Sequence, residues 1–307
     1  MRRREFIAAA AAGPVYAARG KQMARRRYKA NVDLSIIGFG GIVVVGMEQS
    51  AADKAVASSV ERGINYFDVA PTYADGEAEI KLGHALKPFR KDVFLACKTT
   101  KRDAKEARAE LERSLQRLHT DHFDLYQFHA VSSMKDVEQI FAPGGAAETF
   151  LAARKEGKVR FLGFSAHHAE AALALMNRME LDSILFPVNF VCWSQGNFGP
   201  QMLATAKEKG MARLALKAMA HTRWPEGTSR KQTAYPKCWY KPLDEKEAAA
   251  LALRFTLSQD ITAAIPPGDE RLYELALSLA AEFKPLKRGE EKEVLARAQG
   301  VEPIFRA

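Results

Sequence analysis

Short apolar segments recur along the chain, and each is followed by a longer segment in which apolar residues return every three or four positions. The short segments have the length and composition of buried strands, and the longer ones have the periodicity of amphipathic helices. Eight segments qualify as strands, at residues 36–40, 64–69, 93–98, 123–128, 160–165, 184–189, 213–217 and 261–265. Eight strands alternating with helices predict the α/β class, as one closed parallel (β/α)8 TIM barrel rather than an open doubly wound sheet.

Helices are expected between these strands, most clearly at residues 51–62, 104–118 and 146–155. Glycines stand where such helices should end, because a left-handed residue commonly terminates a helix. These glycines are Gly63, Gly157 and Gly210. Residues 28–37 predict a short hairpin that plugs the bottom of the barrel. Two connections, residues 131–145 and 220–243, are longer than most β/α loops.

Size and composition are consistent with one such barrel. The chain has 307 residues, of which 47% are hydrophobic and 27% are charged, and a TIM barrel takes roughly 250 residues. No apolar run approaches the roughly 20 residues of a membrane-spanning helix, so no stable membrane insertion is expected. The net charge of +9 suits an anionic ligand, but an ordinary solvated basic surface is the simpler interpretation. The cysteines form no CxxC pair and no cluster with metal-ligand spacing, so no metal is predicted.

The first residues differ in character from the rest of the chain. Arg3 and Arg4 precede Phe6-Ile7, an alanine-rich stretch and the small residue Ala17. This order of charged, weakly apolar and small residues resembles a twin-arginine export signal. We therefore expect a signal peptide at residues 1–18, a barrel at residues 19–307, the export machinery as a partner, and a periplasmic location. The alternative is an N-terminal extension on a cytoplasmic protein.

Polar side chains follow three successive predicted strands. Asp68 and Lys98 stand at the ends of the second and third strands, and Tyr73 and His129 follow the second and fourth. A parallel barrel gathers these strand ends on one face. A tyrosine beside a lysine and an acid suits a proton donor with a lowered pKa. Each residue alone has a structural alternative, such as a helix cap or a surface charge, but the combination favours a catalytic site.

The segments GINYFDVAPTYADGEAEIKLG, CKTT and YQFHA resemble the aldo-keto reductase family. The residues that match the family signature are Gly63, Asp68, Ala70, Tyr73, Glu79, Leu82 and Gly83. The resemblance runs from about Leu34 to the region of Leu279. It implies reduction of a small carbonyl compound by NADP(H), with Tyr73 as the general acid, Lys98 and Asp68 supporting it, and His129 orienting the carbonyl.

The cofactor side matches the family less well. Ser165 keeps the family serine, but Ala166 replaces the asparagine that follows it, and Leu185 stands near a family glutamine. Asn189 is expected to take over binding of the nicotinamide carboxamide from these replaced amide side chains. Leu216 takes the place of an aromatic residue. The remaining expected cofactor contacts are Lys217, Pro266, Gly268 and Arg271.

Cofactor choice is expected to depend on Arg271. This arginine could bind the 2′-phosphate of NADP(H), whereas the neighbouring Asp269 and Glu270 oppose it and leave NAD(H) as the alternative. Residues 220–243 carry aromatic and basic side chains that either fold over the dinucleotide or pack against the barrel rim. Stacking on nucleic acid bases is the least favoured interpretation of that composition.

The sequence thus predicts an NAD(P)H-dependent reductase of aldehydes or ketones. The alternative is a nucleotide-binding sensor or scaffold protein on the same barrel, with little turnover, since the expected carboxamide pocket is altered. The physiological substrate and the oligomeric state are left open by the sequence.

Overall fold

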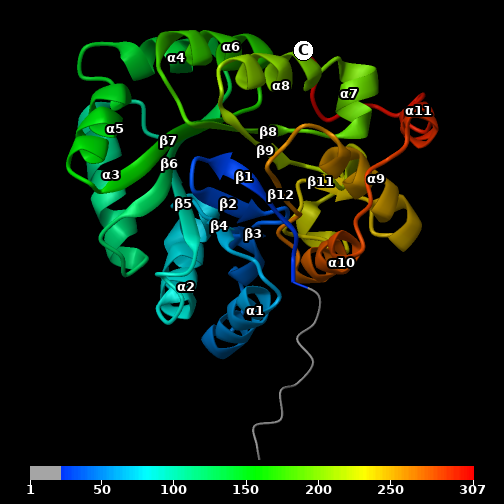
Figure 1. The fold of residues 1–307 in the computed structure, drawn as a ribbon, viewed down its shortest axis with the longest axis horizontal. Helices are drawn as coiled ribbons and strands as arrows, with labels where there is room; N and C mark the ends of the chain where they lie inside the picture. Colours follow the sequence, from blue (N-terminus) through cyan, green and yellow to red (C-terminus); the bar gives the residue numbers. More distant parts are fainter. Residues whose placement is uncertain (1–21) are drawn as a thin grey trace, which may run out of the picture.

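The computed structural model describes residues 22–307 of the chain (Figure 1). The expected leader at residues 1–18 lies outside the described residues. Eight parallel strands form the central sheet, in the order β12-β9-β8-β7-β6-β5-β4-β3. These strands are β3 (Phe39–Gly40), β4 (Tyr66–Asp68), β5 (Phe94–Thr99), β6 (Phe123–Val131), β7 (Val159–Ala166), β8 (Ser183–Pro187), β9 (Ala212–Leu216) and β12 (Ala263–Ile265).

The sheet closes on itself. A parallel bridge between Ile37 and Ala264 joins the first strand to the last, and the amide of Gly38 donates to the carbonyl of Ala264 at 2.9 Å. The predicted (β/α)8 barrel is therefore confirmed, and each of the eight predicted segments overlaps one barrel strand.

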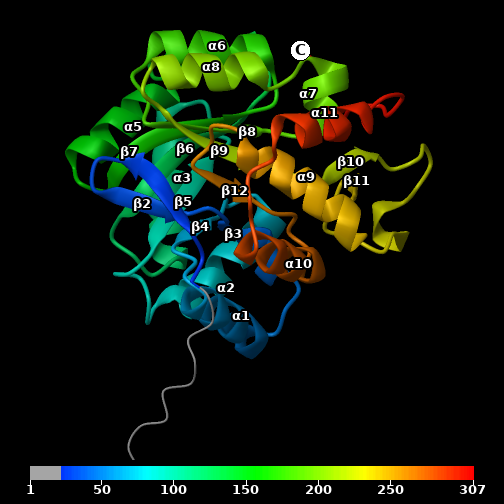
Figure 2. The same ribbon diagram turned by 45° about the vertical axis from the view of Figure 1, so that its right-hand side comes forward.

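Helices surround the barrel in Figures 1 and 2. They are α1 (Gln49–Glu61), α2 (Glu77–Leu86), α3 (Ala104–Arg117), α4 (Met134–Phe141), α5 (Ala146–Lys155), α6 (Ala169–Arg178), α7 (Phe190–Gly196), α8 (Pro200–Glu208), α9 (Lys246–Ser258), α10 (Glu270–Ala281) and α11 (Arg288–Ala296). The helices expected from the periodicity correspond to α1, α3 and α5. The expected helix-terminating glycines, Gly63, Gly157 and Gly210, all have positive φ.

A hairpin covers the end of the barrel at which the strands begin. It consists of β1 (Arg25–Lys29) and β2 (Val32–Ser35), and Figure 1 shows it across the centre of the ring of strands. Tyr28 and Leu34 from the hairpin are buried against side chains inside the barrel, and the Tyr28 hydroxyl donates to Ser183 Oγ at 3.0 Å. The predicted plug is confirmed, but it starts earlier than expected because Arg25, Arg26 and Arg27 already pair with β2.

The two long connections contain secondary structure of their own. The first contains α4, which begins with a capping box between Ser133 and Asp136. The second contains an antiparallel pair, β10 (Ala220–Arg223) and β11 (Tyr240–Pro242). Figure 2 shows this pair extending away from the barrel beside α9. Local caps and pairing satisfy backbone groups that a structureless loop would leave to water.

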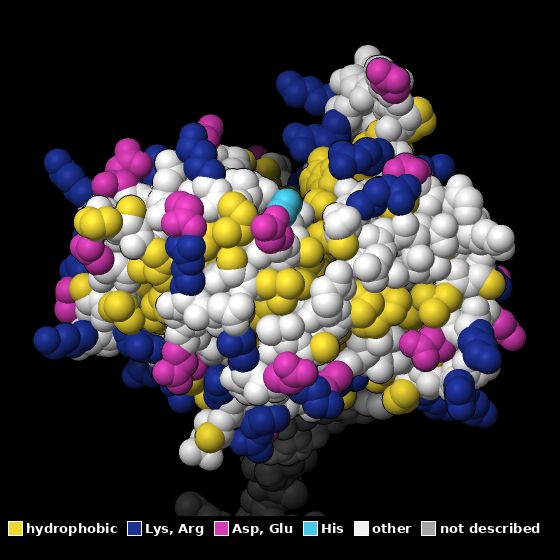
Figure 3. Space-filling view, turned by 90° about the horizontal axis from the view of Figure 1, so that it is seen from above, with side chains coloured by type: hydrophobic (Ala, Val, Ile, Leu, Met, Phe, Trp, Pro, Cys, Tyr) yellow, Lys and Arg dark blue, Asp and Glu magenta, His cyan; other side chains and the backbone are white. Residues whose placement is uncertain are grey.

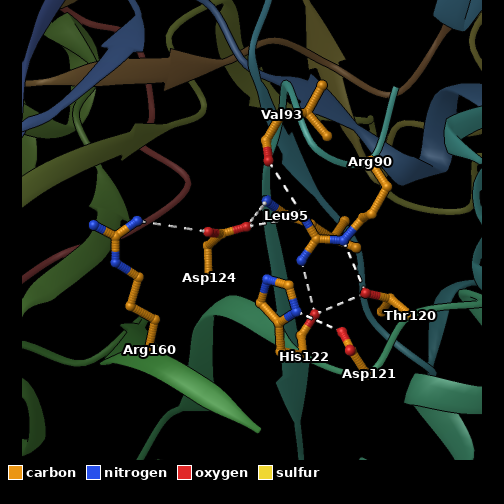
Figure 4. Close-up of polar contacts among 8 residues, drawn as sticks. All are labelled: Arg90, Val93, Leu95, Thr120, Asp121, His122, Asp124 and Arg160. Atoms are coloured by element: carbon orange, nitrogen blue, oxygen red, sulfur yellow. Dashed lines mark hydrogen bonds and ion pairs between the residues drawn. The ribbon is translucent and has the colours of Figure 1, made fainter. Parts of the chain in front are cut away.

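A wide hollow of about 1160 Å³ lies at the ends where β5 and β6 begin. The guanidinium of Arg90 lies beside it and donates to Thr120 Oγ1 at 2.9 Å and to the carbonyl of His122 at 2.8 Å. It also donates to Asp124 at 3.2 Å, and Asp124 accepts from the amide of Leu95 (Figure 4). These contacts satisfy Arg90, so this arginine ties together the segments that lead into the two strands.

Charge is mixed on the face of the molecule seen from above (Figure 3). On the face shown in Figure 3, Lys and Arg side chains are interspersed with Asp and Glu, and this favours the simple interpretation of the excess positive charge. Across residues 22–307, no helix is long and apolar enough to cross a membrane. In the same residues, no group of three or more His, Cys, Asp or Glu side chains could hold a metal ion.

Candidate active site

Four side chains expected at the site line one cavity of about 220 Å³ at the ends where the strands finish. Asp68 is the last residue of β4, Lys98 belongs to β5, and His129 belongs to β6. Tyr73 begins the short 3-10 helix Tyr73–Gly76, which follows β4. The barrel therefore brings Asp68, Tyr73, Lys98 and His129 together, as their positions near the ends of three successive strands suggested.

The ammonium group of Lys98 is the centre of this group. It forms an ion pair with Asp68 Oδ1 and donates to Tyr73 Oη at 3.2 Å and to the carbonyl of Val69 at 3.3 Å. Burial alone would lower the pKa of Lys98, but the charge of Asp68 and the phenol of Tyr73 raise it above its ordinary value. Lys98 therefore stays charged at neutral pH, in a position where water barely reaches it.

Asp68 is held by neighbours on both carboxylate oxygens. Its Oδ2 atom accepts from Gln127 Nε2 at 3.0 Å and from the hydroxyl of Tyr66 at 3.3 Å. Only 2% of Asp68 is exposed. A buried charge is tolerated when its partners are this complete, so Gln127 and Tyr66 fix the carboxylate that in turn fixes Lys98. Sequence analysis did not identify either of these two residues.

The pKa of Tyr73 corrects one expectation. Burial raises it above its ordinary value of 10, and the positive charge of Lys98 opposes the rise without reversing it. The sequence predicted a lowered pKa because it showed the neighbouring lysine but not the extent of burial. Tyr73 is consequently a neutral phenol with a proton to donate across the physiological pH range.

His129 stands beside the phenol. The two rings are 5.8 Å apart at their centroids and nearly perpendicular. Burial and the charge of Lys98 lower the pKa of His129 well below its ordinary value. Its Nδ1 atom is buried and has no hydrogen-bond partner. A neutral imidazole that lines the cavity can form a hydrogen bond with a polar atom of a ligand placed next to Tyr73.

Residues of the family signature position the segment that carries Tyr73. Glu79 in α2 is fully buried and forms an ion pair of 3.0 Å with Arg117 at the end of α3. Gly83 lies so close to α3 that a Cβ atom there would be 2.4 Å from the carbonyl oxygen of Arg117. The close packing of α2 on α3 thus explains a glycine and a glutamate that do no chemistry themselves.

Of the expected cofactor contacts, Ser165, Lys217, Pro266 and Gly268 line the same cavity. Lys217 follows β9 and has positive φ, at 65°. Ser165 Oγ accepts from the amide of Ala130 at 2.8 Å. Leu185 and Leu216 also line the cavity and give it an apolar wall where the family resemblance implied polar and aromatic groups.

Asn189 and Arg271 have other partners and do not line the cavity. Asn189 Oδ1 caps α7, and its amide nitrogen donates to the carbonyls of Lys217 and Ala220, at 3.0 and 2.6 Å. Because its side chain is fully buried and satisfied, Asn189 holds the turn after β9 instead of replacing the lost amide. Arg271 makes a two-atom contact with Asp269, at 3.0 and 3.1 Å, so its guanidinium is already paired.

The cavity has further lining residues besides the expected contacts. Trp239, Tyr240 and Lys237 come from the connection between β9 and α9, whose aromatic and basic side chains were expected to fold over the dinucleotide or to pack against the barrel rim. His167 follows Ser165 by two residues, at the end of β7. Its ring stacks on Phe305, with centroids 5.0 Å apart. No pattern in the sequence indicated that the chain's last residues reach this site.

Comparison with known proteins gives the family. The aldo/keto reductase family model matches residues 37–293, and the chain belongs to this family. The chain is 28% identical over 173 residues to the uncharacterized oxidoreductase YqkF of Bacillus subtilis. This match covers 52% of this chain and 54% of the relative. It is 24% identical over 301 residues to L-galactose dehydrogenase of Arabidopsis thaliana, covering 88% and 92%.

Solved structures share the fold. An aldo-keto reductase from Klebsiella pneumoniae in complex with NADPH superposes with a TM-score of 0.69 at 18% identity, and the match covers 94% of this chain and 98% of that one. The chain spans about half the length of several curated relatives that it matches. Family membership is thus established, whereas substrate and cofactor preference have to be inferred from the site.

Proposed function

We propose that the protein reduces the carbonyl group of a small aldehyde or ketone to an alcohol, with a reduced nicotinamide dinucleotide as hydride donor and Tyr73 as general acid. The observation that carries the proposal is the contact of the Lys98 ammonium with both Asp68 and the Tyr73 phenol. Membership of the aldo/keto reductase family supports oxidoreductase chemistry of this kind.

The proton required by the reaction comes from Tyr73. When bound, the reduced nicotinamide supplies a hydride to the carbonyl carbon, and the carbonyl oxygen then needs one proton to become a hydroxyl. Tyr73 donates that proton from a neutral phenol, because burial raises its pKa. Lys98, 3.2 Å away, stabilises the phenolate that remains. General acid catalysis of this type is worth about 100- to 10,000-fold in rate.

His129 orients the substrate in this proposal. Its ring stands nearly perpendicular to that of Tyr73, so a carbonyl oxygen between them can accept hydrogen bonds from the phenol and the imidazole. His129 stays neutral because its pKa is lowered, so it can donate through only one of its two ring nitrogens. It therefore directs the oxygen without competing with Tyr73 as the acid.

The residues of the cavity fit a dinucleotide. Ser165, Lys217, Pro266 and Gly268 line it and would hold the cofactor. Lys217 is a cation that forms no ion pair with any described carboxylate, which suits a phosphate. We favour NADP(H), with NAD(H) as the alternative. The pairing of Arg271 with Asp269 means that a 2′-phosphate would have to compete with that carboxylate.

A second candidate function follows from the apolar wall of the cavity. Leu185 and Leu216 lie where the family resemblance implied groups that hold the nicotinamide carboxamide. A nucleotide-binding sensor or scaffold with little turnover would need the dinucleotide site without accurate placement of the nicotinamide. In this alternative the protein has the same fold and binds the dinucleotide in the same cavity, but it catalyses little carbonyl reduction.

The two functions are separated by one assay. Purified protein is mixed with NADPH or NADH and a panel of aldehydes and quinones, and cofactor oxidation is followed by loss of nicotinamide absorbance. We expect turnover with at least one carbonyl compound. Binding of NADPH, seen by fluorescence, without oxidation by any member of the panel favours the sensor.

We also propose that residues 1–18 direct export through the twin-arginine pathway, so that the mature protein is periplasmic. The support is the order Arg3-Arg4, Phe6-Ile7 and Ala17 in the sequence. N-terminal sequencing of the native protein should give a start near Ala18. An intact N-terminus on cytoplasmic protein would refute export and leave the proposed reductase activity unaffected.

A further inference from the structure

Lys217 is a cation inside the active-site cavity without an acidic partner. Its ammonium lies over the rings of Trp239 and Tyr240, at 5.4 and 5.0 Å from their centroids. Within residues 22–307, no carboxylate pairs with it, and burial lowers its pKa to about 8. Aromatic faces stabilise an ammonium group only in part. A lysine in such surroundings is better satisfied when an anion enters the cavity.

The position of Lys217 is built by its surroundings. Its backbone adopts φ of 65°, a conformation that carries strain for a residue with a side chain. Asn189 donates to the carbonyl of Lys217 at 3.0 Å and to that of Ala220 at 2.6 Å. Two hydrogen bonds from one fully buried amide therefore hold this turn, which places Lys217 in the cavity wall.

A second unpartnered group lies in the same cavity. The Nε2 atom of His167 is buried and has no hydrogen-bond partner, and the ring is stacked on Phe305 with an interplanar angle of 4°. Burial, and then the charge of Lys217, lower the pKa of His167 to about 4. His167 is thus a neutral imidazole with a fixed ring, and it is close enough to Lys217 to respond to its charge.

Other cations of the cavity are already engaged. Lys98 forms an ion pair with Asp68, and Lys237 donates to the carbonyl of Val43 at 2.8 Å. Lys217 and His167 differ from them because neither the ammonium nor Nε2 has a hydrogen-bond partner within the described residues. Both residues line the cavity that Tyr73 and His129 also line.

We propose that Lys217 and His167 Nε2 form a subsite for an anionic oxygen group of a ligand that occupies the cavity with Tyr73. The inference rests on the proposed reductase function and specifies the chemistry that its site accepts. The anionic group is either a carboxylate carried by the carbonyl substrate or a phosphate of the dinucleotide. The lysine supplies the charge, and the imidazole donates one hydrogen bond that fixes the direction of the anion.

The test compares Lys217→Met with Lys217→Arg, which keeps the charge, and with Lys241→Met. Lys241 is exposed on β11 and does not line the cavity, so it serves as a matched loss of charge nearby. His167→Phe keeps a flat ring for stacking on Phe305 but removes the hydrogen-bond donor. Thermal melting establishes that each variant is folded.

Two quantities are measured for every variant. One is the dissociation constant of NADPH, from quenching of protein fluorescence without any substrate. The other is the ratio of kcat/KM for succinic semialdehyde to kcat/KM for butanal, two four-carbon aldehydes that differ in one carboxylate. We expect Lys217→Met either to raise the dissociation constant of NADPH or to lower the substrate ratio, by about 10- to 100-fold. Lys217→Arg should recover part of the loss, and His167→Phe should show a smaller loss in the same quantity.

The measurements identify the source of the anion. A fall in the substrate ratio with unchanged NADPH affinity assigns the subsite to a substrate carboxylate. A loss of NADPH affinity with an unchanged substrate ratio assigns it to a cofactor phosphate. The proposal is overturned if Lys217→Met changes both by less than about twofold, or if Lys241→Met produces an equal loss. If the wild type reduces no carbonyl compound, binding of NADPH, inorganic pyrophosphate and succinate to the same variants still tests the subsite.

Discussion

The ammonium of Lys98 lies 3.2 Å from the phenol oxygen of Tyr73 while it also binds the carboxylate of Asp68. The lysine therefore connects a buried anion to the proton donor. Because Asp68 balances its charge, Lys98 can remain protonated inside the barrel. Because Tyr73 stays within hydrogen-bonding distance, the same charge is available when the phenol loses its proton.

Replacing Lys98 by methionine should reduce both activity and stability. The phenolate formed on Tyr73 loses its cation, and Asp68 is left as a buried charge without its ion-pair partner, which costs about 3 kcal/mol or more. Urea denaturation measures the stability change, and steady-state kinetics measures the rate. Unchanged values for both would mean that Lys98 supports neither Tyr73 nor Asp68.

The pH dependence of the same variant has a definite sign. The protonated phenol is the active form, and burial already raises the pKa of Tyr73 above 10. Wild-type reduction of a neutral aldehyde should therefore lose no activity through Tyr73 below about pH 9. Without Lys98 the pKa rises further, so the alkaline limb of the profile moves to higher pH. A downward shift of that limb would contradict the assigned contact.

Packing of α2 on α3 can be tested with two glycines in helices. At Gly83 an added Cβ would be 2.4 Å from a backbone oxygen, whereas at Gly289 in α11 nothing lies within 4 Å. Gly83→Ala should destabilise the protein by about 1–3 kcal/mol or more because it overpacks the interface. Gly289→Ala should be neutral or stabilising by up to about 1 kcal/mol. Equal effects of the two substitutions in urea denaturation would argue against the close contact.

Anion binding at Lys217 should weaken with rising pH. The pKa of about 8 means that the charged form is lost above that pH, so affinity for the anion should be about tenfold weaker at pH 9 than at pH 7. One other cation of the cavity, Lys237, also has a pKa that burial lowers, so the Lys217→Met variant is needed to separate its contribution. The remaining titratable groups around Lys217 should not change charge in this range. Those groups are Lys98, Tyr73, Cys238 and Tyr240, whose pKa values are raised, and His129 and His167, whose pKa values are lowered.

This pH effect is measured by titrating the protein with NADPH and with succinate at several pH values. The Lys217→Met variant provides the control, since it should show no such dependence. An affinity that is constant from pH 7 to pH 9 in the wild type would contradict an ammonium–anion contact.

Much of the barrel could be predicted from the sequence because buried parallel strands are short, apolar and separated by helices. The four residues Asp68, Tyr73, Lys98 and His129 could be predicted as well, since each stands near the end of a strand. The hydrogen bonds of Asn189 could not be predicted from local sequence, because its partners Lys217 and Ala220 belong to a turn that is distant in the chain. Contacts made by side chains over long separations depend on packing that no local pattern encodes.

The position of His167 and the raised pKa of Tyr73 also depend on packing between distant segments. His167 lies in a short polar segment with no periodicity, and its ring is fixed by Phe305, 138 positions later in the chain. The pKa of Tyr73 is raised because the assembled barrel buries its phenol. Sequence patterns report which residues are present near a strand end, whereas burial and orientation follow only from the assembled barrel.

Tyr73 is the proposed proton donor in carbonyl reduction, and the Tyr73→Phe variant shows whether its hydroxyl is needed. The substitution keeps the ring and removes only the hydroxyl that contacts Lys98. Tyr235→Phe, which removes a hydroxyl bonded to Asp244, is the matched control. In a single-turnover assay with NADPH and an aldehyde, we expect a loss of about 100- to 10,000-fold for Tyr73→Phe, with NADPH affinity nearly unchanged. A rate within a few-fold of the wild type would contradict this role of Tyr73.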